Sequence, residues 1–204
     1  MTRQSIAVMA SGRGTNLAAI LEAANKGKCP VDVRVVISNK VDAPALKIAR
    51  DAGVDTVLFI DPEKYSDRRS YDQACIEVIQ TQSCQWVVLA GYMRILSSLF
   101  VFHFKHRLIN IHPSLLPSFT GANAVADALG YGVKFSGCTV HLVSEKVDEG
   151  AILAQAIVPV MNTDTVESLH QRIHQKEYQL YPETLRCLIE KGFRLDGRRV
   201  VWNS

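Results

Sequence analysis

An amide and an imidazole stand two positions apart in Asn110-Ile111-His112. The apolar residues 108–111 predict a strand, and residues two apart in a strand point to the same side. We therefore expect Asn110 and His112 to lie together at the carboxyl end of this strand, where open α/β sheets bind ligands. An amide can donate to a developing oxyanion, and an imidazole can move a proton near neutral pH. The alternative is a core histidine whose ring bonds only to backbone.

A carboxylate is the third candidate group. Asp148 belongs to Val147-Asp148-Glu149-Gly150, an acidic turn expected between two strands. An acid in a turn is usually only solvated, but this one could orient His112 and favour its protonated form. The other histidines are weaker candidates, and they include His141, inside an expected strand, and His170 and His174, expected to be an exposed pair on a helix.

A glycine-containing segment, Ser11-Gly12-Arg13-Gly14-Thr15-Asn16, lies between an expected strand and an expected helix. Glycines there let backbone N–H groups approach an anion, and the helix N-terminus adds a favourable dipole. The dinucleotide fingerprint is incomplete, because Leu17 stands where its third glycine would be and no ribose-binding acid follows the second strand. The functional interpretation is a site for one phosphomonoester. The alternative is a tight turn without a ligand.

Alternating apolar and amphipathic stretches predict the elements that position these groups. The N-terminal half contains expected strands at 6–10, 31–38, 56–60, 86–90 and 108–111, and expected helices at 17–24, 43–52 and 66–80. This rhythm is typical of right-handed βαβ units, and continuously apolar strands indicate a sheet covered on both faces. We expect an α/β fold with a mostly parallel open sheet, helices on both faces and a Rossmann-like N-terminal half.

The C-terminal half has a different pattern. It begins with a Pro-containing loop at 113–122, and it contains an expected helix at 123–131, strands at 135–144 and 151–160, a helix at 165–187 and a hairpin at 193–201. The hairpin is indicated by Asp196-Gly197, and the two strands flanking the acidic turn predict an antiparallel portion. Without a repeat or a linker, we expect a single domain over 1–204, with halves 1–110 and 111–204.

Composition excludes several classes of protein. The chain has 204 residues, 48% of them hydrophobic and 21% charged, and its net charge of +3 comes from 23 basic and 20 acidic residues. This balance does not favour a nucleic-acid partner. No apolar run reaches the roughly 18 residues of a membrane span, and no signal peptide is indicated, so the expected compartment is the cytoplasm. The five cysteines lack C-x-x-C spacing, and four are expected to be small buried residues.

Several motifs occur together in one order. They are residues 11–16, Ala90-Gly91-Tyr92-Met93-Arg94-Ile95-Leu96, the run Asn110-Ile111-His112-Pro113-Ser114-Leu115-Leu116-Pro117-Ser118-Phe119, residues 137–141 and Asp148-x-Gly150. From residue 6 to about residue 182 the chain resembles the phosphoribosylglycinamide formyltransferase family of folate-dependent enzymes. The run from Asn110 is the most specific of these motifs.

The resemblance implies one reaction, without a metal. A formyl group passes from the co-substrate 10-formyltetrahydrofolate to the amine of N1-(5-phospho-D-ribosyl)glycinamide, a step of de novo purine biosynthesis. It implies that Asn110, His112 and Asp148 are catalytic: the amide and a protonated imidazole stabilise the oxyanion, and the carboxylate supports the imidazolium through water. The partners are then these small molecules, not nucleic acid or membrane, and the chain is a monomer or a homodimer.

The resemblance also assigns binding residues. It implies that the half 1–110 binds the ribonucleotide phosphate and that the half 111–204 binds folate and carries the catalytic residues. The ribonucleotide residues are Gly12, Arg13, Gly14, Thr15, Asn16 and Glu177. The folate residues are Met93, Arg94, Ile95, Leu96, Asn110, Val143 and Asp148.

Two departures keep an alternative open. Many members have histidines where Asn123 and Val125 stand, and the pattern here is similar to formyltetrahydrofolate hydrolase, which transfers the formyl group to water. That enzyme tends to have a histidine at the position of Pro113 and an extra N-terminal domain. Here a proline stands at that position, and the first expected strand starts by residue 6, so we expect no such domain. Both points favour the transferase. The methionyl-tRNA formyltransferase, which has a C-terminal domain, is disfavoured. A non-catalytic ligand sensor on the same fold is the remaining alternative, against which the three catalytic residues argue.

Overall fold

The computed structural model describes residues 3–203. It divides into two compact units, Met1–Ile109 and Asn110–Ser204. The boundary falls inside strand β5 (Leu108–His112), one residue from the division expected between the two halves. Whether both units work as a single formyltransferase domain stays a prediction.

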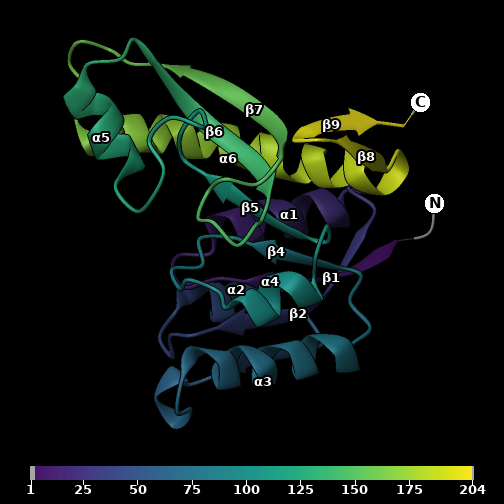
Figure 1. Cartoon of the computed structure of the whole chain (residues 1–204). Helices are drawn as coiled ribbons and strands as arrows, with labels where there is room; N and C mark the ends of the chain where they lie inside the picture. Colours follow the sequence, from purple (N-terminus) through teal and green to yellow (C-terminus); the bar gives the residue numbers. More distant parts are fainter. Residues whose placement is uncertain (1–2, 204) are drawn as a thin grey trace. The chain divides into compact units, whose positions relative to one another are not determined.

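The first unit alternates strands and helices (Figure 1). Its strands before β5 are β1 (Gln4–Met9), β2 (Val31–Ser38), β3 (Thr56–Phe59) and β4 (Trp86–Leu89). Its helices are α1 (Thr15–Asn25), α2 (Pro44–Asp51), the short 3-10 turn η1 (Pro62–Lys64), α3 (Arg68–Thr81) and α4 (Ser98–His103). Each strand expected from the apolar runs is present within two residues of its expected ends.

Together with β6 (Phe135–Leu142) and β7 (Ile152–Pro159), these strands form one seven-stranded sheet in the order β3-β2-β1-β4-β5-β6-β7. β1 is parallel to both of its neighbours, so that Met9 pairs with Ile37 of β2 and with Leu89 of β4. All three side chains are buried, as expected for central parallel strands covered on both faces. α1 packs against α2, and α3 packs against α4. The expected mostly parallel α/β fold is confirmed.

The strand order contains a topological switch point. From β1 the chain steps to β2 and then β3 on one side, and it returns to add β4 on the other side of β1. Loops that follow the two strands at such a point leave the sheet in opposite directions and open a crevice at its carboxyl edge. In this unit those loops follow β1 and β4: the first contains Gly12 and Gly14 and leads into Thr15 and Asn16 of α1, and the second contains Met93–Leu96.

The second unit is antiparallel at its centre. After the end of β5 it contains α5 (Ala124–Tyr131), β6 (Phe135–Leu142), β7 (Ile152–Pro159), α6 (Val166–Glu190) and the hairpin β8 (Phe193–Asp196) and β9 (Arg199–Trp202). β6 and β7 pair antiparallel, and α6 packs against both. α6 begins with a capping box in which Thr165 and Ser168 bond to each other's backbone N–H groups. The expected antiparallel portion is therefore confirmed.

Two expectations about individual side chains have different outcomes. Four of the five free cysteines are buried, as expected, and Cys187 is half-buried. The expected exposed pair His170 and His174 is wrong, because the two rings lie 4.1 Å apart and only 15% of the His174 side chain is exposed. α6 packs against α5 as well as β6 and β7, so more than one face of this helix is covered. No helix within residues 3–203 is long and apolar enough to cross a membrane.

Candidate active site

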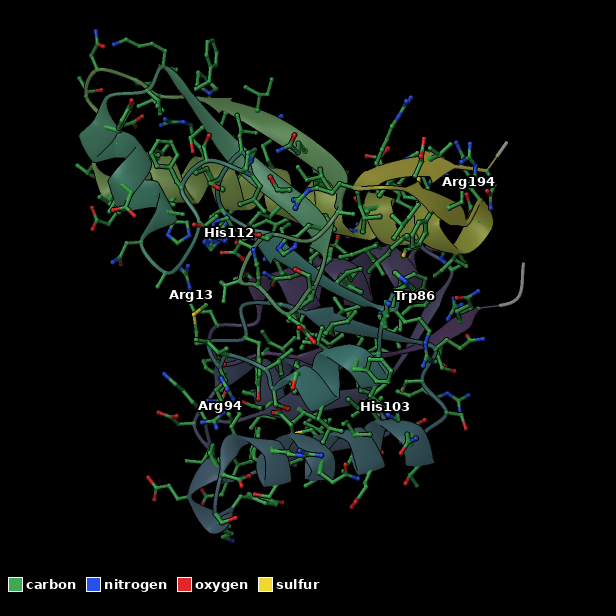
Figure 2. All side chains as sticks on the ribbon, in the orientation of Figure 1. Arg13, Trp86, Arg94, His103, His112 and Arg194 are labelled. Carbon is green, nitrogen blue, oxygen red and sulfur yellow. The ribbon has the colours of Figure 1, made fainter. Side chains whose placement is uncertain are left out.

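The imidazole of His112 lies between two oxygen acceptors at the end of β5 (Figure 2). Its Nε2–H donates to the carbonyl oxygen of Phe119 at 2.8 Å, and its Nδ1 lies 3.4 Å from Oδ2 of Asp148. The side chains of His112 and Asp148 are 6% and 8% exposed, so solvent screens this pair weakly. At 3.4 Å no water fits between the two atoms, and the expected water-mediated contact is direct in this structure. Each ring nitrogen thus faces an oxygen that can accept a hydrogen bond from it, which fixes the orientation of the ring.

Asp148 is held in place by its own turn, between β6 and β7. Its backbone has φ +56°, in the left-handed region that few non-glycine residues occupy. Its Oδ2 also accepts the backbone N–H of Gly121 at 2.8 Å. Gly150 is required two residues later, because a Cβ there would lie 1.5 Å from the carbonyl oxygen of Leu142. The Asp148-x-Gly150 motif thus combines a fixed carboxylate with the close approach that the turn makes to β6.

His141 is a fourth member of this cluster. It is 1% exposed, its Nδ1–H donates to the carbonyl oxygen of Leu142 at 3.0 Å, and its Nε2 lies 3.3 Å from Nδ2 of Asn110. Burial lowers its pKa below the ordinary value near 6.5, an effect only partly opposed by the Leu142 carbonyl and by Asp148, whose Oδ1 is 3.7 Å from Nε2. The neutral ring accepts one amide hydrogen of Asn110, which fixes the orientation of that amide. The structure thus places His141 beside Asn110 and Asp148, whereas the sequence indicated only a histidine inside a strand.

The loop between β5 and α5 is held to β6 by buried polar side chains. Thr139 donates its hydroxyl hydrogen to the carbonyl oxygen of Ser114 at 2.7 Å and accepts the N–H of Leu116 at 3.1 Å. Ser114 donates in turn to the carbonyl oxygen of Ser118 at 2.6 Å. These bonds fix the loop just before Phe119, whose carbonyl faces His112. Thr139 and His141 are two apart on β6. Polar residues within an otherwise apolar strand are the sequence signal that could have identified these two residues, because buried polar groups need hydrogen-bond partners.

The loop after β1 leads into α1 through Gly14, a position at which any residue with a Cβ would be strained. Gly14 has φ +75° and precedes the first residue of α1. A Cβ at this position would lie 2.7 Å from the backbone Cα of Ala45. Gly12 and Arg13 are exposed, and a Cβ at Gly12 would meet no atom within 4 Å. α1 has no side-chain cap and no acid in its first turn, so its N-terminal N–H groups and its dipole favour an anion there.

The loop after β4 is tied directly to the loop after β1. Ser11 donates its backbone N–H to the carbonyl oxygen of Gly91 at 3.0 Å, and its Oγ accepts the N–H of Met93 at 2.8 Å. Met93 and Ile95 are 72% and 63% exposed, whereas the guanidinium of Arg94 turns back over the ring of Tyr71. The first unit thus brings the two loops together at its switch point, with apolar side chains of the second loop turned outward.

Other expected or doubtful site residues lie on the second unit. Val143 is half-buried just after β6, and Glu177 is 4% exposed on α6 with its Oε2 3.9 Å from Nδ1 of His174. Asn123 is exposed before α5, whereas Val125 is buried on that helix at 5% exposure. A buried valine cannot exchange a proton. Position 125, where many family members have a histidine, therefore has no proton-transfer role in this chain.

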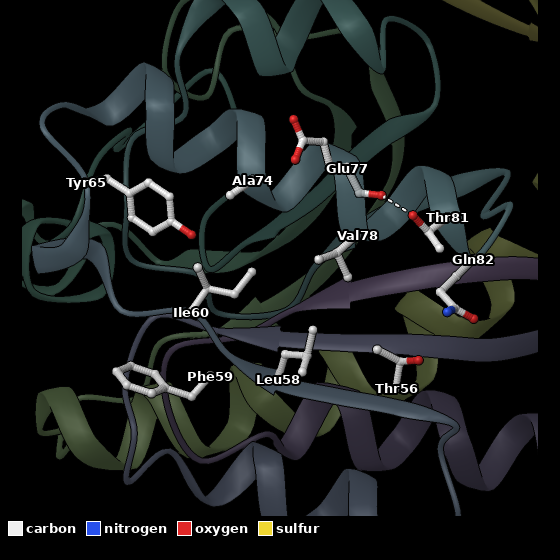
Figure 3. A pocket seen from close by; sticks show the side chains of 10 residues that line it. All are labelled: Thr56, Leu58, Phe59, Ile60, Tyr65, Ala74, Glu77, Val78, Thr81 and Gln82. Atoms are coloured by element: carbon white, nitrogen blue, oxygen red, sulfur yellow. Dashed lines mark hydrogen bonds between the residues drawn. The ribbon is translucent and has the colours of Figure 1, made fainter.

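A cavity of about 480 Å³ lies between β3 and α3 in the first unit (Figure 3). Its wall is formed by Thr56, Leu58, Phe59, Ile60, Tyr65, Ala74, Glu77, Val78, Thr81 and Gln82. None of these is among the expected site residues. Within residues 3–203, no three His, Cys, Asp or Glu side chains are grouped so that they could hold a metal ion.

The fold and the cluster define an α/β enzyme with the groups needed to stabilise an oxyanion and move a proton. The family profile described as formyl transferase matches residues 4–185. The chain therefore belongs to the formyl transferase family. The resemblance stated from the motifs is confirmed, and so is the class of enzyme, a formyltransferase.

Individual relatives agree with this assignment. The chain is 42% identical over 203 residues to a phosphoribosylglycinamide formyltransferase of Escherichia coli, covering 96% of this chain and 95% of the relative. A crystal structure of glycinamide ribonucleotide transformylase 1 from Symbiobacterium toebii superposes with a TM-score of 0.96 at 46% identity, covering 99% of this chain and 95% of that one. The chain is also 40% identical to a trifunctional purine biosynthetic protein of Gallus gallus, over 97% of this chain, and it spans only 20% of that relative's length.

Proposed function

We propose that this chain transfers a formyl group from 10-formyltetrahydrofolate to the amine of N1-(5-phospho-D-ribosyl)glycinamide in purine biosynthesis. The observation that carries the proposal is the placement of His112 between the carboxylate of Asp148 and a carbonyl oxygen, beside Asn110 on the same strand. Formyl transfer to an amine needs an oxyanion stabilised and a proton moved, and this cluster has groups for both.

The oxyanion is stabilised by Asn110 and His112. When the amine attacks the formyl carbon, the carbonyl double bond opens and its oxygen becomes negative. His141 accepts one hydrogen of the Asn110 amide, and the other hydrogen of that nitrogen donates to the oxyanion. The imidazolium of His112 adds a positive charge, which Asp148 stabilises from the Nδ1 side. Asp148, His141 and the Phe119 carbonyl keep these two donors oriented before substrate arrives.

The protons balance within the reaction. The attacking amine loses one proton, and the folate nitrogen gains one as its bond to the formyl carbon breaks and the carbonyl re-forms. His112 gives its proton to the leaving nitrogen and regains one from the amine. In this structure its Nε2–H donates to the carbonyl oxygen of Phe119. This Nε2 proton is the one transferred to the substrate, and it leaves the hydrogen bond to Phe119 when it does so.

Binding is assigned to the loops of the first unit and to polar residues of the second. Gly12, Arg13, Gly14, Thr15 and Asn16 bind the phosphate at the uncapped start of α1, and Glu177 binds another part of the ribonucleotide. The backbone of Met93–Leu96 binds the folate ring system, with Val143 and Asp148. The outward apolar side chains of Met93 and Ile95 support this assignment, because they offer surface for a flat, partly apolar ligand.

This proposal includes the wider expectations from the sequence. Residues 1–204 act as one formyltransferase domain, with the reaction in the cytoplasm. The partners are the two small-molecule substrates, and the chain is a monomer or a homodimer.

A product analysis tests the proposal. The protein is incubated with 10-formyltetrahydrofolate and the ribonucleotide, and the ribonucleotide is examined by mass spectrometry. We expect its mass to rise by one formyl group with the wild type and far more slowly with His112→Asn. Free formate as the main product would identify the alternative, the hydrolase, which Asn123 and Val125 favour. An unchanged folate would exclude both enzymes.

A further inference from the structure

The loop from Gly91 to Ser97, here the 91–97 loop, is anchored to α3 by buried groups that the mechanism does not use. Asp72, in the second turn of α3, is 1% exposed. Its Oδ2 accepts the backbone N–H of Ser97 at 2.6 Å. Ser97 is also the N-cap of α4, where its Oγ accepts the N–H of Phe100 at 3.4 Å. The end of the loop is therefore fixed by a buried, charge-assisted hydrogen bond, which is among the strong ones in proteins.

The middle of the loop is held by an aromatic ring of the same helix. The guanidinium carbon of Arg94 lies 4.6 Å from the centroid of the Tyr71 ring, within cation–π distance. Tyr71 is fully buried and accepts a hydrogen bond from the hydroxyl of Tyr92 at 3.1 Å. The Nε of Arg94 is buried, and within residues 3–203 it has no hydrogen-bond acceptor. The guanidinium is thus held against the ring face of Tyr71, while its Nε has no hydrogen bond in this part of the chain.

A buried thiol of α3, Cys75, lies near both charged groups of the anchor. Burial raises the pKa of Cys75 to about 12, and among the smaller effects Asp72 raises it while Arg94 lowers it. Asp72 and Cys75 are one turn apart on α3, so Arg94 enters from the loop toward the same turn of the helix. Arg94 stacks on Tyr71 and Ser97 bonds to Asp72, so two adjacent residues of α3 hold two different parts of the 91–97 loop.

This anchoring divides the side chains of the loop into two sets. Tyr92 and Ser97 point inward and are 8% and 7% exposed, and Arg94 turns to α3. Met93 and Ile95 point outward. The inward side chains fix the backbone of the loop. The side chains of Met93 and Ile95 and the backbone next to them are therefore accessible to a ligand.

We propose that Asp72 and Tyr71 are positioning residues that set the affinity for the folate substrate by fixing the backbone of Met93–Leu96, without touching the substrate. The inference rests on the proposed function, and it adds that part of the folate affinity originates on α3. Arg94 then acts through its side chain as an anchor and contributes to binding through its backbone.

Steady-state kinetics on Asp72→Ala and Asp72→Asn test this role. A hydrogen bond to a charged group is worth enough that its loss predicts a rise of about tenfold in KM for 10-formyltetrahydrofolate with Asp72→Ala. The KM for the ribonucleotide and kcat should stay near wild type. Asp72→Asn keeps an acceptor of the same shape, and the rise should be smaller. Equal rises in both KM values, or none in either variant, would overturn the proposal.

Asp67→Ala is the matched control. Asp67 caps the same helix by accepting the N–H of Ser70 at 2.7 Å, and it is exposed. Its loss should lower the melting temperature while leaving both KM values unchanged. A rise in the folate KM of this variant equal to that of Asp72→Ala would show that the effect comes from helix stability, and it too would overturn the proposal.

The ring of Tyr71 gives a second test that does not depend on Asp72. Tyr71→Phe keeps the ring face under Arg94 and should keep the folate KM near wild type, whereas Tyr71→Leu should raise it. The reverse order would contradict the anchor. If the wild type itself formed no formylated ribonucleotide, the proposed function would fail, and that result is distinct from unchanged KM values in the variants.

Discussion

At the scale of single residues, the account depends on the charge of Asp148. Asp148→Asn keeps the volume of the side chain and an oxygen for the N–H of Gly121, but it removes the charge beside Nδ1 of His112. We expect kcat to fall by about 100-fold or more, as when a proton-transfer group loses its function. The KM for the ribonucleotide and the melting temperature should change little. The measurement is kcat with both substrates saturating.

The next carboxylate along the chain is the control for this variant. Glu149 pairs with exposed Lys146 at 3.5 Å, outside the His112 cluster. Glu149→Gln removes the same charge from the same turn and should leave kcat near wild type. A similar loss in both variants would assign the effect to the charge of the turn as a whole and contradict the specific role of Asp148.

His141 predicts a dependence of stability on pH. Burial lowers its pKa in the folded protein below the ordinary value near 6.5. The unfolded chain therefore binds more protons at this residue in mild acid, and the folded protein loses stability as the pH falls through 6.5. His141→Gln does not titrate, so its melting temperature should fall less than that of wild type between about pH 7.5 and about pH 5.5. An equal or larger fall in the variant would contradict this assignment.

The sequence pattern located Asn110, His112 and Asp148 but not His141. The first two were found by alternation on one strand, and Asp148 by its type and turn. His141 lies in an otherwise apolar strand, and only the close approach of the β6–β7 turn brings Asp148 beside it. Its bond to Asn110 joins residues 31 apart in the chain. Contacts of this kind depend on how strands fold back, which local periodicity does not encode.

At the scale of elements, the two glycines of the loop after β1 should differ. A Cβ at Gly14 would lie 2.7 Å from the backbone of α2, and the residue has φ +75°. Gly14→Ala should therefore lower the melting temperature clearly, by a destabilisation of about 1 kcal/mol or more. A Gly14 variant therefore does not separate ribonucleotide binding from stability. Differential scanning fluorimetry on both glycine variants checks the difference.

Gly12 supplies the cleaner binding variant. It is exposed, and a Cβ there would meet no atom within 4 Å. Gly12→Val should keep the melting temperature and raise the KM for the ribonucleotide, because a branched side chain obstructs the approach of a phosphate to the backbone. The folate KM should stay near wild type. Unchanged ribonucleotide KM in this variant would count against a phosphate site at this loop.

Most elements were predictable because their hydrophobic periods are strong. β2 was located at both ends, and the helix expected at 165–187 begins at Val166, after its N-cap Thr165. α4 was not predicted, because six residues, Ser98–His103, are too few to show a helical period. Its position is fixed instead by the cap at Ser97 and by packing against α3, and both depend on tertiary structure.

At the scale of the whole molecule, the family and the fold are established, and the identity of the formyl acceptor is the central claim. Two positions give opposite indications. Val125 is buried and apolar where many family members have a histidine, which is the pattern expected of the hydrolase, whereas Pro113 favours the transferase. A transferase needs its amine substrate held beside the formyl carbon, since this placement gives the reaction its rate advantage over attack by water. The rate of formyl removal should therefore depend on the ribonucleotide.

The most direct measurement follows the absorbance change on release of tetrahydrofolate from 10-formyltetrahydrofolate, with and without N1-(5-phospho-D-ribosyl)glycinamide. We expect fast release only when the ribonucleotide is present, and a loss of this release with His112→Asn. Release by the wild type that is equally fast without the ribonucleotide would contradict the account and identify water as the formyl acceptor.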